Sequence, residues 1–415
     1  MADSNMNRNI MSVSWGDHLE AWDGDDAMDQ PDKILRCAER WKSEFGAGAI
    51  YWREMRSWSK FRIGFTPPGA PPRKVFDDYE RKGYDEHELI TTQVKEMGYK
   101  VYMYATMFDE GFPLSEGWQG GIYGWQSQFT MANPEYLARD KEGRPHYGIM
   151  EYTFPDVRRY TIRRILSALG DYDFDGVFVC TRSQSKPAVH GDQFGFNEPV
   201  VEEYERRYGV DMMRRNFELE PWRRLRGEGL TQFFRELRSA LDARGMKLGI
   251  GVPAGNYIGP PLGNLYLDWK TWVEEKLVDD LVIDQVAVRC PSFWHLMWPK
   301  NPGYGYLVND EDHYGIKGGD DYGEKRFWSI PLVKGSPAYE GAMERLYGAI
   351  RNDYGPHCAR NGCRLHVARM WSVHDPEEEA RLLDTEGVSG LALGSFGAVV
   401  DRRAGGVRPD VANPA

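Results

Sequence analysis

The chain has 415 residues and a net charge of −11, with 41% hydrophobic and 28% charged residues. This composition is typical of a folded globular protein and excludes collagen, coiled coils and low-complexity chains. Charges of both signs are interspersed and the isoelectric point is about 5.4, so we expect no nucleic acid partner.

The first 26 residues contain no basic start followed by an apolar block, and the longest weakly polar run, residues 387–400, is short and rich in glycine. Neither stretch fits a leader peptide or a membrane span, so we expect a cytoplasmic protein with no membrane partner. The five cysteines are widely spaced without a CxxC pair, which favours reduced thiols over a disulfide framework or a zinc site. The oligomeric state stays open.

Strands and helices are predicted to alternate after a polar extension over residues 1–30. Short apolar runs predict eight strands, over residues 47–52, 100–105, 147–152, 175–180, 247–252, 283–288, 365–370 and 388–393. Apolar residues at helical spacing, with capping residues, predict helices that begin near residues 31, 85, 155, 199, 219, 268, 337 and 375.

This alternation predicts an α/β protein with a single (β/α)8 TIM barrel over residues 31–400, followed by a tail over residues 401–415. An open doubly wound sheet is the alternative, but no GxGxxG or P-loop signature follows any predicted strand. Long loops rich in aromatic residues, at 111–144, 183–197 and 292–322, should rise from the C-terminal face of the barrel.

Acidic residues follow several predicted strands, where a TIM barrel carries its chemistry. The candidate catalytic residues are Asp109, Glu110, Glu151 and Asp192. Two carboxyl groups, one as acid and one as base or nucleophile, are what glycoside hydrolysis requires. Neighbours on an extended chain point in opposite directions, so only one of Asp109 and Glu110 should face the cleft.

Four arginines also fall at predicted strand ends: Arg53, Arg182, Arg289 and Arg369. If they converge on one mouth, they form a pocket for a carboxylate or sulfate group, because guanidinium binds such anions in a bidentate way. The alternative is that each arginine pairs with a neighbouring acid of the chain.

Aromatic residues make up 13% of the chain, many in loops rich in glycine and proline. Flat rings with a polar edge suit the faces of sugars, although loop aromatics also pack on one another. Further candidate substrate contacts are Trp52, Trp118, Trp125, Asn256, Tyr257, Trp294, Trp371 and His190. His190 and Asp192 have a spacing that is common by chance, so we expect no metal and no cofactor.

Four stretches carry a family resemblance: DGVFVCTRSQ at 175–184, GDQFGFNEPVVEEYERRYGVD at 191–211, PWRR at 221–224 and YLDWKTWVEEKLVDDLV at 266–282. Together they resemble the glycosyl-hydrolase-like family-10 group of TIM-barrel proteins, over roughly residues 35–400. The resemblance implies a carbohydrate-active barrel. Members of that group often carry Asp where this chain has Cys180, so catalysis from the fourth predicted strand is in doubt.

These observations predict an enzyme that cleaves glycosidic bonds in an oligo- or polysaccharide, one bearing carboxylate or sulfate groups. One alternative is a polysaccharide lyase, in which arginine neutralises a uronate and Tyr257 or His190 removes the C5 proton. Another is a carbohydrate-binding barrel without catalysis, which the cysteine at position 180 keeps open.

Overall fold

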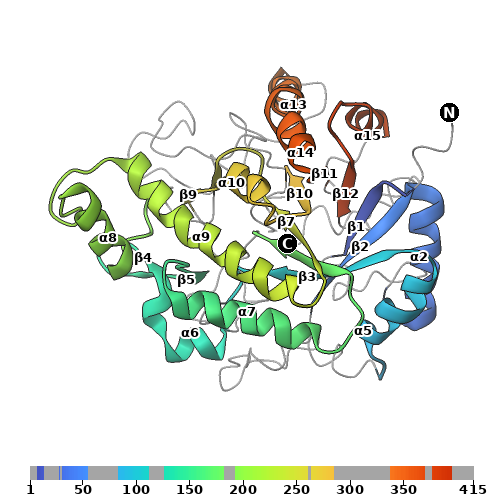
Figure 1. Cartoon of the computed structure of the whole chain (residues 1–415), viewed down its shortest axis with the longest axis horizontal. Coiled ribbons are helices and arrows are strands. Elements are labelled where there is room, and N and C mark those ends of the chain that lie inside the picture. Colours follow the sequence, from blue (N-terminus) through green and yellow to red (C-terminus); the bar gives the residue numbers. More distant parts are fainter. Residues whose placement is uncertain are drawn as a thin grey trace, which may run out of the picture.

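The computed structural model describes residues 7–13, 28, 30–54, 83–111, 126–181, 192–259, 263–284, 337–369 and 376–394. Within these ranges a closed barrel of parallel strands runs in the order β1, β12, β11, β10, β7, β6, β3 and β2 (Figure 1). The strands are β1 (Asn9–Val13), β2 (Ala47–Arg53), β3 (Lys100–Thr106), β6 (Gly176–Cys180), β7 (Lys247–Gly251), β10 (Asp280–Ile283), β11 (Arg364–Arg369) and β12 (Gly390–Gly394). The predicted TIM barrel is confirmed.

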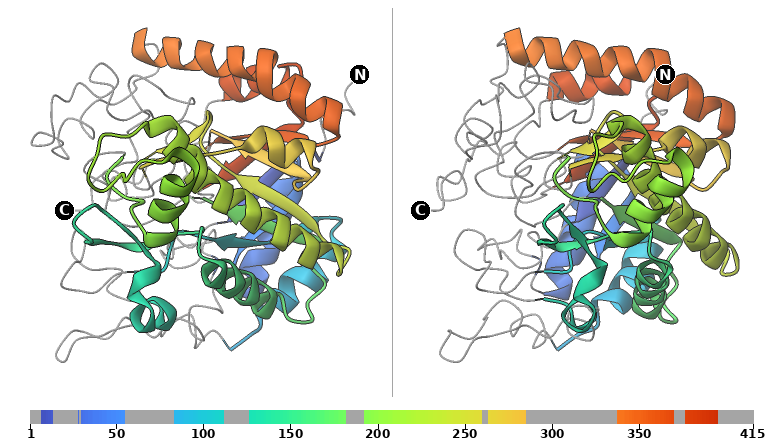
Figure 2. Two further views of the ribbon diagram at one scale, coloured as in Figure 1. Left: turned by 60° about the vertical axis from the view of Figure 1, so that its left-hand side comes forward. Right: turned by 90° about the vertical axis from the view of Figure 1, so that its left-hand side faces the viewer.

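Helices surround the barrel on its outside (Figure 2). They are α2 (Pro31–Phe45), α5 (Glu86–Leu89), α7 (Pro155–Leu169), α8 (Glu198–Tyr208), α9 (Leu219–Asp242), α10 (Trp269–Glu274), α13 (Pro337–Ala349), α14 (Gly355–Asn361) and α15 (Pro376–Leu383), with π-helical turns at Ile90–Val94 and Ile350–Tyr354. None of these described helices has the length and apolar character needed to cross a membrane.

Helix α2 shows how the sequence determines this outer layer. Pro31 occupies its first turn, where a missing N–H costs nothing, and Gly46 ends it with a φ of 59°. Ile34, Ala38 and Trp41 fall on one face and are buried, as their spacing predicts. That face packs against the outward side of the neighbouring strands, in the main hydrophobic core.

Two small hairpins interrupt the alternation of strands and helices. β4 (Leu137–Arg139) pairs with β5 (Pro145–Met150), and β8 (Tyr257–Gly259) pairs with β9 (Gly263–Tyr266), both antiparallel. Figure 1 shows β4, β5, α8 and the short helix α6 (Gln128–Ala132) gathered on the left of the view. The prediction of a barrel strand over 147–152 is therefore wrong, because this segment pairs only within its hairpin.

The first barrel strand lies inside the stretch expected to be a polar extension. β1 pairs with β2 on one side and β12 on the other, so the barrel begins before residue 31. Asn9 is polar for a structural reason: its side chain donates to Phe45 O at 2.8 Å and accepts from Leu391 N at 2.9 Å. The sixth strand is also shifted, since β10 ends where a strand over 283–288 was predicted to start.

Aromatic side chains fill the inside of the barrel. Tyr51 stacks on Phe178 with ring centres 4.2 Å apart, and Tyr102 and Tyr104 belong to the same interior cluster. Gly176 makes room for Tyr102, since a Cβ at this glycine would lie 2.6 Å from the ring. The barrel is therefore a packed core, and ligands have access only at its ends.

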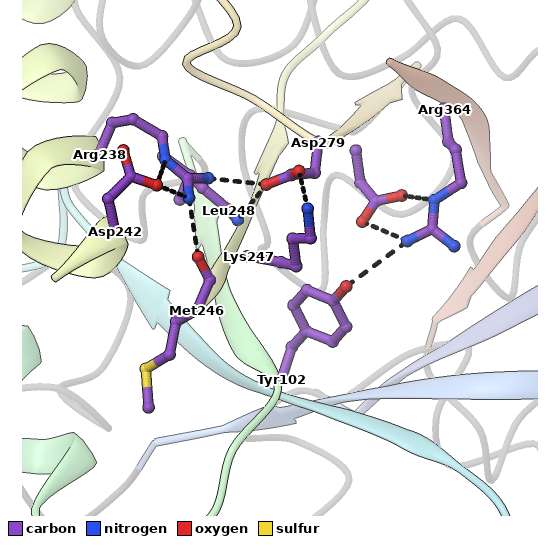
Figure 3. Close-up of polar contacts among 9 residues, drawn as sticks. Tyr102, Arg238, Asp242, Met246, Lys247, Leu248, Asp279 and Arg364 are labelled. Atoms are coloured by element: carbon purple, nitrogen blue, oxygen red, sulfur yellow. Dashed lines mark hydrogen bonds and ion pairs between the residues drawn. The ribbon is translucent and has the colours of Figure 1, made fainter. Parts of the chain in front are cut away.

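An ion network lies at the amino ends of the strands (Figure 3). Asp279 accepts from Arg238 Nη1 at 2.7 Å, Lys247 Nζ at 2.8 Å and the backbone N of Leu248 at 2.9 Å. It thereby ties α9 to the starts of β7 and β10. Polar groups at this end of a TIM barrel usually stabilise the fold and take no part in the chemistry.

Asp280 continues this network into the barrel interior. Its buried carboxylate binds Arg364 at 2.7 Å and His366 Nε2 at 3.1 Å, and Arg364 reaches the Tyr102 hydroxyl at 3.5 Å. Burial alone would raise the pKa of Asp280, but His366 and Arg364 lower it below its usual value. The network closes the end of the barrel opposite the candidate site.

Candidate active site at the barrel mouth

The carboxyl ends of the barrel strands form an edge that we call the barrel mouth. Arg53 is the last residue of β2, and its Nη2 binds Asp109 Oδ2, which follows β3, at 3.1 Å. Both side chains are buried. The Arg53 guanidinium lies 5.2 Å from the ring centre of Tyr104, so the pair stands on top of the aromatic interior of the barrel.

Glu110 faces away from its neighbour Asp109. Its Oε1 lies 2.8 Å from Arg164 Nη1 and its Oε2 accepts from the Tyr160 hydroxyl at 3.1 Å, both partners being on α7. Burial alone would lower the pKa of Arg164, but the charge of Glu110 outweighs that effect and raises it. The fully buried Glu110 carboxylate anchors α7 to the end of β3, and its catalytic role stays a prediction.

Glu151 and Asp192 are held by neighbouring turns of α9. Glu151 Oε2 lies 3.4 Å from Arg226 Nε, both side chains being 3% exposed. Asp192 makes two bonds to Arg223, at 2.9 and 2.6 Å. Glu151 does not end a barrel strand as predicted, because it follows β5 of the hairpin. The structure brings these two acids to one face of α9.

Each of the four predicted acids therefore has its own arginine. Among the arginines predicted at strand ends, Arg53 pairs with an acid of the chain, which is the alternative weighed from sequence. Of the four, Asp109 stands at the end of a barrel strand with its partner on the adjacent strand.

Arg369, the last residue of β11, binds an acid that the sequence analysis missed. Its Nη1 donates to Asp284 Oδ2 at 2.8 Å, and its Nε lies 3.2 Å from Glu378 Oε1 on α15. Asp284 directly follows β10. Residue 284 was placed inside a predicted strand; the acid pair at 279–280 followed by the apolar run Leu-Val-Ile was the signal for an earlier strand ending at 283.

Two predicted contacts are explained by other roles. Trp52 is not a stacking platform for sugar, because it is fully buried on the outer side of β2 and its Nε1 donates to Glu86 of α5 at 3.4 Å. Tyr257 carries the Arg223 guanidinium 5.7 Å from its ring centre and donates a hydrogen bond to Glu220. Burial and the Glu220 charge raise the pKa of Tyr257, which disfavours it as the base of a lyase.

Asn256 is exposed in the loop after β7, and its Oδ1 accepts from Trp269 Nε1 at 3.2 Å. Cys180 ends β6 inside the barrel, fully buried against the interior aromatics. The remaining predicted contacts lie outside the described residues: Arg182, Arg289, Trp118, Trp125, Trp294, Trp371 and His190. Most of the three predicted aromatic loops lies there too.

Within the described ranges, no three side chains of the His, Cys, Asp or Glu type gather as a metal ion would need. The described part of the mouth offers charged oxygen and guanidinium groups instead. These can orient hydroxyl-rich ligands and move protons.

A closed parallel barrel with paired acids and arginines at its C-terminal edge defines a TIM-barrel protein. Residues 127–293 match the family described as Glycosyl hydrolase-like 10. The resemblance seen in the sequence is thereby confirmed over those residues.

No curated protein matches the chain. Among solved structures it is similar to the maltogenic alpha-amylase AmyB from Thermotoga neapolitana, with 10% identity and a TM-score of 0.40 over 94% of this chain and 68% of that one. A Group II chitinase catalytic domain from Ostrinia furnacalis has 13% identity and a TM-score of 0.37, and the match covers 88% of this chain and 64% of that one. A GH42 beta-galactosidase from G. stearothermophilus has 12% identity and a TM-score of 0.38, and the match covers 68% of this chain and 40% of that one. The chain thus spans less than two thirds of the last two. Similarities at this level carry no argument about function.

Proposed function

We propose that this protein is a glycoside hydrolase that cleaves bonds within an oligo- or polysaccharide at the barrel mouth. The observation that carries the proposal is the buried Arg53–Asp109 pair, which joins the ends of β2 and β3. It occurs in a chain whose residues 127–293 match a glycosyl-hydrolase-like family. A carboxylate at this edge can take a proton from an attacking water.

The charge of the sugar is a separate question. A preference for uronate or sulfate rested on four free arginines, yet Arg53 binds Asp109 and Arg369 binds Asp284 and Glu378. Their positive charges are thus balanced within the chain. The proposed activity therefore includes neutral as well as acidic substrates.

The test is turnover of neutral, uronic and sulfated oligosaccharides, read as new reducing ends. Asp109→Asn should lower kcat by about 100-fold or more, the usual scale for loss of an acid–base group. Its melting temperature and oligosaccharide binding should stay close to those of the wild type. Asp173→Asn is the matched control, because this carboxylate is 82% exposed and lies before β6, at the opposite end of the barrel.

Three results would contradict the proposal. Full activity of Asp109→Asn would remove Asp109 from the chemistry. Products with the ultraviolet absorbance of an unsaturated uronate would indicate a lyase. Binding of oligosaccharides without any turnover would indicate a carbohydrate-binding barrel, in agreement with a cysteine in place of an acid at the end of β6.

A further inference from the structure

Asp284 occupies an unusual backbone conformation at the barrel mouth. Its φ is 61°, in the left-handed region that residues other than glycine rarely adopt. Among the described residues, Asn7 and Lys276 share this property, but neither ends a barrel strand. Backbone strain of this kind collects at functional sites, where the surrounding structure maintains it.

The surroundings of Asp284 differ from those of the other acids at the mouth. Its side chain is 12% exposed and its ion-pair partner Arg369 is 1% exposed. That guanidinium also lies 3.2 Å from Glu378, so one positive charge serves two carboxylates. Burial raises the pKa of Asp284, and the opposing effect of Arg369 does not restore its usual value.

A glycosidase needs one carboxyl group that keeps a proton and one that is charged. Asp109 is the acid to which the proposed function assigns the second role. β3 and β10 are not neighbours in the barrel, since β6 and β7 separate them. The two acids therefore approach a substrate at the mouth from different sides.

We propose that Asp284 is the proton donor of the reaction and that Arg369 positions it. This inference rests on the proposed function. The Asp284 carboxyl gives its proton to the glycosidic oxygen while the bond from the anomeric carbon to that oxygen breaks, its electron pair going to the oxygen. A water molecule bonds to the anomeric carbon and releases a proton to Asp109. One water is consumed, and solvent returns both carboxyl groups to their starting states.

The experiment compares two glycosides of the sugar that the wild type hydrolyses best. A dinitrophenyl leaving group departs without protonation, whereas a phenyl leaving group needs the acid. Asp284→Asn should lower kcat/KM by about 100-fold or more on the phenyl glycoside and by less than about 10-fold on the dinitrophenyl glycoside. It should also remove the loss of activity at high pH that the proposal predicts for the wild type. Asp173→Asn again serves as control.

The outcomes separate the two proposals. A wild type that hydrolyses no glycoside or oligosaccharide overturns the proposed function and this inference together. An active wild type with equal losses on both glycosides, or with no loss, overturns the role of Asp284 alone. If Asp284→Asn does not fold, Asp284→Glu retains the carboxyl group but displaces it. That variant should still lose more activity on the phenyl glycoside, and equal losses would refute the assignment.

Discussion

The buried pair of Glu110 and Arg164 makes a sharp prediction about stability. Glu110→Gln removes the negative charge 2.8 Å from Arg164 Nη1, while Arg164 is only 4% exposed. Arginine cannot give up its proton, so the variant buries an uncompensated charge. The expected loss is about 3–5 kcal/mol of unfolding free energy. Arg164 also donates to Thr106 O at 2.6 Å, a bond that the variant keeps and that holds the uncompensated guanidinium in its buried position.

Urea unfolding measures this loss. With a slope of about 3 kcal/mol per molar urea, 4 kcal/mol moves the midpoint down by about 1.3 M. Tryptophan fluorescence and far-ultraviolet circular dichroism should report the same midpoint, which checks that unfolding is a single transition. Replacing both partners, as Glu110→Met with Arg164→Met, should recover most of the loss because no charge stays buried.

Asp156→Asn on the same helix is the matched control. Its ion pair with Arg159 is exposed, so the midpoint should not move. The reasoning is refuted if Glu110→Gln keeps the wild-type midpoint. It is refuted more strongly if that variant stays folded and loses turnover about 100-fold, because Glu110 would then act in the chemistry.

Three further changes test other parts of the structure. Gly195→Ala should lower the melting temperature, since a Cβ at this position would lie 2.2 Å from Arg226 Nε. The control is Gly143→Ala, which shares the positive φ but whose Cβ would meet nothing within 4 Å, and it should have a smaller effect. Equal effects of the two variants would argue against the clash. The pKa of Asp280 is lowered in the folded protein, so this group stabilises the fold above about pH 4 and loses that effect as the pH falls through its folded pKa. The difference in unfolding free energy between wild type and Asp280→Asn should therefore shrink in acid. A constant difference would contradict the ion pairs of Asp280 with Arg364 and His366. Tyr51→Phe should leave stability unchanged or raise it by about 1 kcal/mol in urea unfolding, because the buried hydroxyl has no hydrogen-bond partner among the described residues; a clear loss would mean that the hydroxyl is satisfied.

The fold class could be predicted because its strongest strands carry local signals. β6 is a run of apolar residues between an Asp-Gly start and a polar loop, and both faces of it are buried. β1 carried no such signal, since Asn9 and Ser12 break its apolar run. The Asn9 side chain bonds to Phe45 O at the end of α2 and to Leu391 N of β12, both distant in sequence, and no local pattern reports that. The total of eight strands was reached only because β5 was counted in place of β1.

The candidate site was harder to predict than the fold. Sequence placed Arg53 and Asp109 correctly at the carboxyl ends of their strands, because both strands were predicted within a residue of their ends. The role of Glu110 depends on Arg164 and Tyr160, which lie about fifty positions away on a helix. Asp284 was missed because the predicted strand ends at residue 288, five residues beyond the observed end of β10, and so hides the residue that follows the strand.

The closure of the barrel by β1 has a consequence for synthesis. The hydrogen bond from Leu391 N to Asn9 Oδ1 joins residues 382 positions apart. A ribosome adding about 5–20 residues per second needs about 20–80 s to make that span. Throughout this interval β1 has no partner on its β12 side, and an unpaired strand edge is a template for aggregation. A chain released before residue 390 would keep that edge open permanently, so we expect truncated products to be found with chaperones and not as folded half-barrels.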